Sequence, residues 1–373
     1  MPPAQALRVA LDATPLIGAR TGVGAFTLHA IEALTADRQL DLCAFALTWR
    51  GRRQLHELLP RGVRPVRRPM AARPLRMAWL RMDAPAIENW TGPVDVVHGT
   101  NFVVPPSRRA ARVVTVHDLT AVRFPALCTP ATLQYPHLLR RAILRGAWVH
   151  TPSTFVADEV IERLGADPGR VVAIASGVPP VASADPSNGR RVAGADRYIL
   201  TIGTIEPRKD HAALVRAFDR VADRDDDIHL VVAGIDGWGT DTFVATMQRA
   251  RHRDRIVRLG YVDDATRSAL LRGATAFAFP SVYEGFGFPP LEAMQVDVPV
   301  VATAVGSLPE VLGDAALLVV PGDDEALADG LARVLGDDDL RARLRDAGRN
   351  RARTLSWRAC AEGLAALYVR AST

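Results

Sequence analysis

Two basic side chains stand where they could hold an anionic ligand. Arg208 and Lys209 lie in TIGTIEPRKDHAALVRAF, after an apolar run and a turn that begins at Gly203, and before a run with helical spacing of its apolar residues. Two fixed positive charges at the start of a helix suit a diphosphate. Lys209 is the only lysine in the chain, and an ammonium is a compact, strongly hydrated charge. The alternative is a surface pair at a helix start that holds no ligand.

A second segment, residues 279–319, has two glutamates eight positions apart, Glu284 and Glu292. Between them lie a glycine-rich run and a double proline: Gly285, Phe286, Gly287, Phe288, Pro289 and Pro290. Glycines let backbone N–H groups approach a ligand, and proline suits the first turn of a helix. The two carboxylates can accept hydrogen bonds from sugar hydroxyls, one from a transferred sugar and one from a ribose. The alternative, a capped helix with solvated glutamates, would leave two exposed phenylalanines unexplained.

A third segment, ALDATPLIGARTGVGAFT, has an apolar run that ends at Asp12 and two glycines, Gly22 and Gly24, before a helical run. Glycines at such a place let backbone N–H groups approach a phosphate at a helix N-terminus. A tight connection between strand and helix without any ligand produces the same pattern.

The elements that must position these residues alternate between short β-rich runs and helical runs, through residues 7–174 and again through 198–319. This alternation predicts an α/β fold with parallel sheets, in which ligands bind beyond the carboxyl ends of the strands. A Pro-, Ala-, Ser- and Gly-rich stretch separates the two halves and reads as a linker. We therefore predict one domain over 1–178, a linker over 179–196, a second domain over 197–355, and a C-terminal helix over 356–373 that could pack back on the first domain.

Composition fits a cytoplasmic protein of two domains. The chain has 373 residues, and its three cysteines are far apart and lack metal-ligand spacing, so neither disulfides nor a zinc site is indicated. No segment reaches the roughly 20 apolar residues that span a bilayer, and the N-terminus does not resemble a signal peptide. Asp225, Asp226 and Asp227 read as a solvated turn and not as a cation site.

Positive charge is concentrated in the first half of the chain. Residues 1–180 carry a net charge of +9 and the remainder −4. Ten arginines lie between residues 50 and 81, interleaved with Leu75, Met77, Trp79 and Leu80, and could lie against anionic lipid on the inner face of the cytoplasmic membrane. A solvated arginine-rich face is the alternative. Nucleic acid is not expected, because no recognised binding motif accompanies the charge.

Together, GTIEPRK and FPSVYEGFGFPPLEAM closely resemble family 4 of the glycosyltransferases, which are retaining enzymes of the GT-B fold, and the likeness covers essentially the whole chain. This fold has two Rossmann-like parallel-sheet domains that face a central cleft. The second motif is most similar to bacterial mannosyltransferases of polysaccharide and glycolipid assembly. The resemblance implies transfer of a hexose, with mannose from GDP-mannose the expected donor, to a glycan or a lipid-linked acceptor.

The resemblance also implies roles for individual residues. Arg208 and Lys209 would hold the donor diphosphate, Glu292 would bind the ribose, and Glu284 would bind the transferred sugar and stabilise developing positive charge. His117, in TVHDL, matches the active-site histidine that touches sugar hydroxyls near the reacting carbon. The full donor-binding set is Gly22, Gly24, Gly203, Arg208, Lys209, Glu284, Gly285, Phe286, Gly287, Phe288 and Glu292. One departure is visible at residues 295–298, where the common glycine is absent.

Two basic side chains and helix N-termini can neutralise a leaving diphosphate, so we expect neither a metal nor another cofactor. No convincing nucleophile lies beside the donor residues in the sequence, and we expect the departing diphosphate to deprotonate the acceptor on the same face. A nucleotide-sugar epimerase or hydrolase of the same fold is the main alternative. A nicotinamide oxidoreductase is disfavoured because the first strand turn lacks a full Gly-x-Gly-x-x-Gly, and a scaffold protein would not need the five polar site residues.

Overall fold

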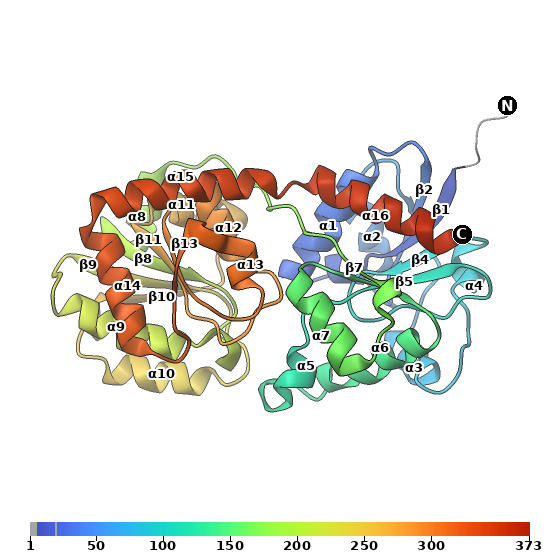
Figure 1. The fold of residues 1–373 in the computed structure, drawn as a ribbon, viewed down its shortest axis with the longest axis horizontal. Helices are drawn as coiled ribbons and strands as arrows, with labels where there is room; N and C mark the ends of the chain where they lie inside the picture. The colour runs from blue at the N-terminus through green and yellow to red at the C-terminus, as the bar shows by residue number, and fades with distance from the viewer. Residues whose placement is uncertain (1–5, 19–20) are drawn as a thin grey trace. The chain divides into compact units, whose positions relative to one another are not determined.

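The computed structural model describes residues 6–18 and 21–373, which form two compact units. Unit 1 contains the chain up to Pro179 together with Leu355–Thr373, and unit 2 contains Pro180–Thr354 (Figure 1). Each unit has a parallel sheet with covering helices. The predicted α/β class with two Rossmann-like domains is therefore confirmed.

Unit 1 contains a sheet of seven parallel strands in the order β3-β2-β1-β4-β5-β6-β7. The strands are β1 (Leu7–Asp12), β2 (Leu40–Phe45), β3 (Arg64–Pro65), β4 (Val96–Gly99), β5 (Ala111–Thr115), β6 (Trp148–Thr151) and β7 (Val171–Ala173). The central strands are apolar and buried along most of their length, as expected for parallel strands covered on both faces.

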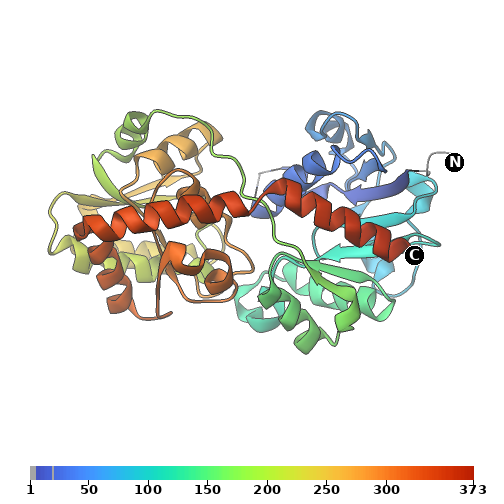
Figure 2. The same ribbon diagram turned by 45° about the horizontal axis from the view of Figure 1, so that its top comes forward.

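The helices of unit 1 are α1 (Gly22–Leu34), α2 (Arg52–Leu58), α3 (Ala72–Trp79), α4 (Glu88–Thr91), α5 (Thr120–Arg123), α6 (Tyr135–Leu144), α7 (Thr154–Leu164) and α16 (Trp357–Ser372). The C-terminal helix α16 packs against α1, and its path along unit 1 can be followed in Figures 1 and 2. The close approach of Gly177 to Trp357 fits this packing, because a Cβ at Gly177 would lie 2.4 Å from the Trp357 backbone nitrogen.

Unit 2 contains a sheet of six parallel strands in the order β10-β9-β8-β11-β12-β13. The strands are β8 (Arg197–Ile202), β9 (Ile228–Ala233), β10 (Ile256–Gly260), β11 (Ala276–Phe279), β12 (Val300–Thr303) and β13 (Ala316–Val319). The helices are α8 (Pro186–Ala193), α9 (His211–Ala222), α10 (Thr240–Arg249), α11 (Asp264–Gly273), α12 (Phe288–Gln295), α13 (Leu308–Leu312), α14 (Asp324–Gly336) and α15 (Asp338–Thr354).

The stretch expected to be a linker, residues 179–196, contains helix α8 of unit 2. Asp185 caps this helix by accepting a hydrogen bond from the Ser187 backbone N–H, and Pro186 occupies its first turn. Helix α8 packs against α11. The approach is close because Gly189 has no side chain, and a Cβ there would lie 2.1 Å from the Ala269 carbonyl oxygen. Residues 179–196 therefore contain a packed helix although their composition is typical of a linker.

Strand order reverses once in each sheet. In unit 1 the reversal lies between β1 and β4, and in unit 2 it lies between β8 and β11. Chain connections leave the two strands of such a pair in opposite directions, so a crevice opens beyond their carboxyl ends where ligands bind. The topology thus marks one place in each unit where functional side chains are expected.

Candidate active site

Three charged side chains meet at the strand reversal of unit 2. The ammonium Nζ of Lys209 lies 2.6 Å from Oε1 of Glu284, and Nη1 of Arg208 lies 2.9 Å from Oε2 of the same carboxylate. Their side chains are only 13%, 16% and 8% exposed for Lys209, Arg208 and Glu284. The cluster is thus a buried carboxylate that pairs each of its oxygens with a separate cation.

Two loops that follow neighbouring strands bring these residues together. After β8 the chain forms a short 3-10 turn, Pro207–Lys209, and Asp210 then adopts a left-handed conformation and caps α9. After β11 the backbone N–H of Val282 donates to the Arg208 carbonyl at 2.8 Å. In return, Nη1 of Arg208 donates to the Tyr283 carbonyl at 2.9 Å. The loops therefore hold each other in register, although the charges lie 75 residues apart in sequence.

Electrostatics keep the cluster charged. Burial alone would raise the pKa of Glu284, but the charges of Arg208 and Lys209 outweigh it and lower that pKa to about 2. Burial lowers the pKa of Lys209, and Glu284 opposes this shift. Arg208 also pairs with Glu206, whose Oε1 lies 2.8 Å from Nη2. An anionic ligand that entered the cluster would meet two partly exposed cations already oriented by protein carboxylates.

The loop after β12 supports the backbone of Glu284 and contributes residues that the sequence did not single out. The backbone N–H and the hydroxyl of Ser307 donate to the Glu284 carbonyl at 3.0 and 3.2 Å. Gly306 adopts a φ of +56°, and a Cβ there would lie 2.2 Å from the same carbonyl oxygen. The glycine in AVGSLPE was the available signal, since it lies between a strand and a helix.

Glu292 lies on α12, is 5% exposed, and pairs with Arg267 of α11. Arg267 was also missed, because nothing near it in the sequence distinguishes it from the many other arginines. The pair fixes the orientation of a buried carboxylate that can still accept further hydrogen bonds.

The glycine-rich run enters α12 through Gly287, which precedes the helix with a φ of +96°. The rings of Phe286 and Phe288 meet edge to face with centroids 5.3 Å apart, and Phe286 is buried. The alternative of a capped helix with solvated glutamates implied two exposed phenylalanines, but the turn folds Phe286 into the unit. Gly285 is buried as well. Gly203 has room for a Cβ, whose nearest atom would be the Lys209 Cε at 3.8 Å.

Of the predicted residues of unit 1, Gly22 and Gly24 follow β1 at the strand reversal, and His117 follows β5, the strand next to β4. Gly22 is the first residue of α1, and the backbone N–H of Gly24 donates to the hydroxyl of Thr21 at 3.4 Å. A Cβ at Gly24 would lie 2.9 Å from the Pro15 carbonyl oxygen, which gives this glycine a packing role. His117 follows β5 and places its ring 5.0 Å from that of Phe26 of α1. Burial lowers the pKa of His117, so the imidazole is neutral near pH 7.

Among the residues that the structure describes, the run of three aspartates at 225–227 forms no metal site. Asp225 accepts two hydrogen bonds from Arg197 at 3.0 Å. Within residues 6–18 and 21–373, no three His, Cys, Asp or Glu side chains are grouped so that they could hold a metal ion. In the same part of the chain, no helix is both long and apolar enough to cross a membrane.

Each half of the chain matches a family of known proteins. Residues 20–181 match Glycosyltransferase Family 4, and residues 187–351 match Glycosyl transferases group 1. The O-antigen chain mannosyltransferase B of Escherichia coli is 32% identical over 302 residues, which cover 79% of this chain and 78% of that protein.

Two solved structures share the fold. Sucrose-phosphate synthase from Thermosynechococcus elongatus has a TM-score of 0.75 at 19% identity and covers 98% of both chains. Anabaena HepE in complex with UDP-glucose has a TM-score of 0.71 at 18% identity, over 96% of this chain and 98% of that one. These likenesses establish the GT-B fold. The chain therefore belongs to the glycosyltransferases, with a Family 4 domain in its N-terminal half and a group 1 domain in its C-terminal half.

Proposed function

We propose that the protein is a retaining glycosyltransferase that moves mannose from GDP-mannose to a glycan or a lipid-linked acceptor in the synthesis of cell-surface polysaccharide or glycolipid. The observation that carries this proposal is the buried cluster of Arg208, Lys209 and Glu284 beside helix α12. It combines two cations for a diphosphate with a carboxylate for a sugar, at the place where the topology of unit 2 expects a ligand.

The cations serve the leaving group. As the bond between the anomeric carbon and the diphosphate breaks, negative charge grows on the diphosphate, and oriented positive charges in a site of low polarity stabilise it most. Lys209 and Arg208 are only 13% and 16% exposed and are held in place by carboxylates, so little reorganisation accompanies the reaction. In this proposal the two side chains replace a metal ion, and no other cofactor takes part.

Glu284 serves the sugar. Both of its oxygens are paired with cations and its pKa is about 2, which makes the carboxylate a poor nucleophile. We therefore assign it to sugar hydroxyls and to the positive charge that develops at the anomeric carbon. The acceptor oxygen then bonds to that carbon on the face that the diphosphate leaves, and the acceptor proton passes to an oxygen of the departing diphosphate. His117 contacts the sugar in the same proposal, as a neutral imidazole.

Glu292 is assigned to the ribose of the donor. Its pairing with Arg267 holds one carboxylate oxygen, and the other can accept from a ribose hydroxyl. The choice of mannose rests on the Escherichia coli relative, whose name is that of a mannosyltransferase. The neighbour HepE was solved with UDP-glucose, so uridine and guanosine donors need to be compared directly.

A thermal-shift panel with GDP, UDP, ADP and their sugar conjugates tests the donor. A ligand at 100 times its dissociation constant stabilises a protein by about 2.7 kcal/mol, which such a panel detects readily. We expect the shift with GDP and GDP-mannose. A shift with UDP compounds alone would overturn the choice of GDP-mannose, and no shift with any compound would overturn the diphosphate site. The anomeric configuration of the product, read by NMR, tests retention, and free mannose without a glycoside product would indicate a hydrolase.

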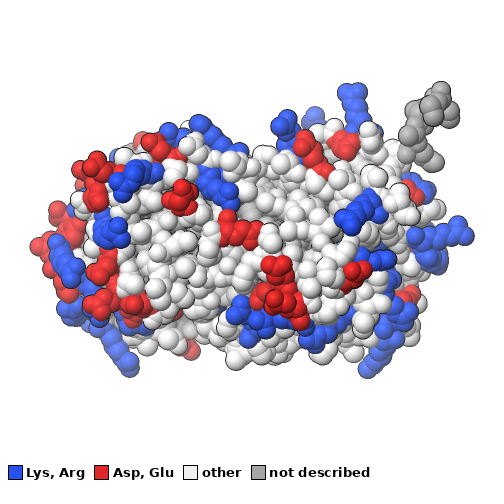
Figure 3. Space-filling view, in the orientation of Figure 1, with Lys and Arg blue, Asp and Glu red and all other residues white. Residues whose placement is uncertain are grey.

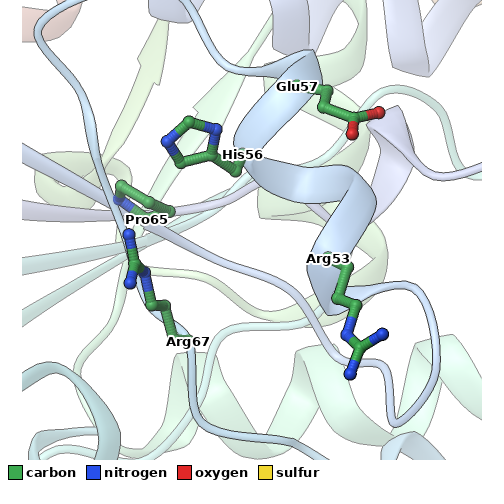
Figure 4. Close-up of a pocket in the computed structure, with 5 residues that line it drawn as sticks. All are labelled: Arg53, His56, Glu57, Pro65 and Arg67. Carbon is green, nitrogen blue, oxygen red and sulfur yellow. The ribbon is translucent and has the colours of Figure 1, made fainter.

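We also propose that unit 1 makes peripheral contact with an anionic membrane on the cytoplasmic side. The face drawn in Figure 3 carries both positive and negative side chains and does not by itself indicate a membrane contact. The proposal rests instead on the ten arginines of residues 50–81. There Arg53 and Arg67 line a hollow of about 340 Å³ between α2 and β3. Figure 4 shows the five residues that line it: Arg53, His56, Glu57, Pro65 and Arg67.

The apolar side chains of this region divide between core and surface. Leu75 and Trp79, expected among those that face lipid, are buried, and Trp79 donates its indole N–H to the Pro85 carbonyl at 3.1 Å. They lie one helical turn apart on α3, so both face the core, whereas Met77 between them is 45% exposed. Flotation with phosphatidylglycerol vesicles and with phosphatidylcholine vesicles tests the contact. We expect flotation with the anionic vesicles only, lost in high salt; no flotation with either would contradict it.

A further inference from the structure

The strand reversal in unit 1 marks a second place for a ligand. In unit 2 the reversal between β8 and β11 carries the charged cluster. In unit 1 the corresponding reversal lies between β1 and β4, and the chain that leaves β4 is the segment Gly99–Val104. The same topological rule that locates the donor residues therefore directs attention to this segment.

The segment is held tightly in an unusual conformation. A Cβ at Gly99 would lie 1.9 Å from the Val103 carbonyl oxygen, so the loop folds back on its own start. Phe102 has a φ of +57°, which is rare for a side chain of this size, and its N–H donates to the Thr115 carbonyl at 2.9 Å. The Thr100 hydroxyl donates to the Asp12 carbonyl at 2.6 Å, which ties the loop to the end of β1. Strained backbone of this kind clusters at functional sites.

Within this loop, Asn101 has a side-chain oxygen with no partner. Its Oδ1 is buried and accepts no hydrogen bond from any described residue. Buried polar atoms in folded proteins are almost always hydrogen-bonded, so an unpaired oxygen in a rigidly held loop calls for a donor from outside the chain. A hydroxyl group supplies such a donor.

The residues on either side of Asn101 contact His117 and Tyr135. Nε2 of His117 lies 2.8 Å from the carbonyl oxygen of Thr100, the residue next to Asn101. A carbonyl only accepts, so Nε2 carries the hydrogen and Nδ1 of His117 remains an acceptor. On the other side, the ring of Phe102 stacks on that of Tyr135 with centroids 5.5 Å apart and planes at 13°. The loop thus combines an unpaired amide oxygen, a neutral imidazole and an aromatic pair.

We propose that the Asn101 side chain binds a hydroxyl group of the acceptor sugar, with Phe102 and Tyr135 as the apolar wall of that subsite. This inference rests on the proposed transferase function. His117 is assigned to the sugar near the reacting carbon, and the acceptor hydroxyl must reach that same carbon. A hydrogen-bonding group one residue from the carbonyl that holds His117 is therefore placed for the acceptor and not for the nucleotide.

Binding of simple glycosides tests this assignment separately from the donor. The probes are the methyl glycosides of mannose, glucose, galactose and N-acetylglucosamine, followed by saturation-transfer NMR in the presence of GDP. We expect at least one glycoside to bind the wild-type protein and Asn101→Ala to weaken it at least tenfold. The thermal shift with GDP should stay unchanged, and Asn89→Ala, an exposed asparagine of the same unit, should bind like wild type.

The stability of the variant separates binding from folding. Because Oδ1 of Asn101 accepts no hydrogen bond within the described chain, Asn101→Ala should keep the melting temperature of the wild type. Asn101→Asp keeps a side-chain oxygen and should bind the glycoside at least as well as wild type. Unchanged glycoside binding in Asn101→Ala, lost binding in Asn101→Asp, or no glycoside binding to a wild-type protein that binds GDP would each overturn the proposal. Failure to bind GDP would instead contradict the proposed function.

Discussion

At the scale of single residues, Glu284 is important both for stability and for the proposed binding of the donor. It neutralises Lys209 and Arg208 in the folded protein, and it is also assigned to the transferred sugar. Removing one partner of a buried ion pair leaves uncompensated charge, which costs about 3–5 kcal/mol of stability. The same change leaves Lys209 without its carboxylate and Arg208 paired only with Glu206, which frees positive charge for a diphosphate.

Glu284→Gln should therefore lower the free energy of unfolding by about 3–5 kcal/mol and increase the stabilisation that GDP provides. Urea denaturation with and without GDP measures both quantities. Glu310→Gln, on the exposed side of α13, is the control and should behave as wild type. An equal effect of GDP on the wild type and on Glu284→Gln would show that the nucleotide does not meet these cations.

Glu292 and Arg267 give a second residue-scale prediction. Glu292→Ala should raise KM for the donor far more than it lowers kcat, because ribose binding is equally strong in the ground and transition states. Arg267→Ala should raise the same KM by a smaller factor, since Arg267 only orients the carboxylate. Steady-state kinetics with varied donor provide the test. If the donor KM of Glu292→Ala is unchanged, the ribose assignment fails.

At the scale of elements, two glycines flank helix α13: Gly306 precedes it in the loop after β12, and Gly313 follows it. Gly306 and Gly313 both have a φ of +56°, but a Cβ at Gly306 would lie 2.2 Å from the Glu284 carbonyl, whereas nothing lies within 4 Å of one at Gly313. Alanine at either position carries the strain of a positive φ, which L-residues rarely adopt, and at Gly313 ψ is −137°, outside the left-handed helical region. Only at Gly306 must the backbone that carries Glu284 move as well.

Gly306→Ala should therefore lose transferase activity, because the backbone that carries Glu284 must move, while Gly313→Ala keeps its activity whatever stability it loses. Turnover of the two variants, compared side by side, decides this, and chemical denaturation measures the stability that each loses. Full activity in both would mean that the contact between Gly306 and Glu284 does not position the carboxylate.

The elements also show why some features were predictable and others were not. The strand runs and the motif loops were predicted because each carries its signal locally, in apolar stretches, glycines and prolines. Strand β3 has only two residues and no apolar run, and α8 has a linker-like composition, so neither was predicted. Arg267 joins the site through a tertiary contact from another segment, and no local pattern marks it, whereas Ser307 follows the glycine of AVGSLPE.

At the scale of the folded unit, a buried chain of hydrogen bonds links the C-terminal helix to the sheet of unit 1. The Tyr368 hydroxyl and Nδ1 of His98 are 2.7 Å apart, Nε2 of His98 lies 2.7 Å from the Thr115 hydroxyl, and that hydroxyl lies 2.9 Å from Nδ1 of His150. The chain ends where Nε2 of His150 meets the Ile174 carbonyl at 3.0 Å. The carbonyl only accepts, so Nε2 of His150 carries a hydrogen. Burial lowers the pKa of both histidines and keeps them neutral, so Thr115 donates to Nδ1 of His150. Nε2 of His98 then donates to Thr115, and the Tyr368 hydroxyl donates to Nδ1 of His98.

This arrangement predicts a loss of stability in mild acid. Burial lowers the pKa of His150 to about 4 and that of His98 well below its usual value of 6.5. Both histidines therefore bind protons more readily in the unfolded chain, so stability is complete above about pH 6.5 and falls as the pH drops toward 4. Each histidine contributes a slope of about 1.4 kcal/mol per pH unit in this window.

Urea midpoints between pH 7.5 and 5 measure that slope. His150→Gln removes one titrating group and should give a flatter dependence on pH, whatever its stability at neutral pH. His56→Gln, an exposed histidine on α2, should retain the wild-type slope. A dependence on pH that is the same in His150→Gln as in the wild type would contradict the neutral buried chain.

The central claim is that Arg208, Lys209 and Glu284 form the donor diphosphate site of a glycosyltransferase. Calorimetric titration of GDP-mannose into the wild type and into Lys209→Ala tests it most directly. We predict that GDP-mannose binds the wild type and binds Lys209→Ala at least tenfold more weakly. The control is Arg220→Ala, which changes an exposed arginine of α9 that pairs with Glu325, and its affinity should equal that of the wild type. Equal affinity in Lys209→Ala and the wild type would contradict the claim.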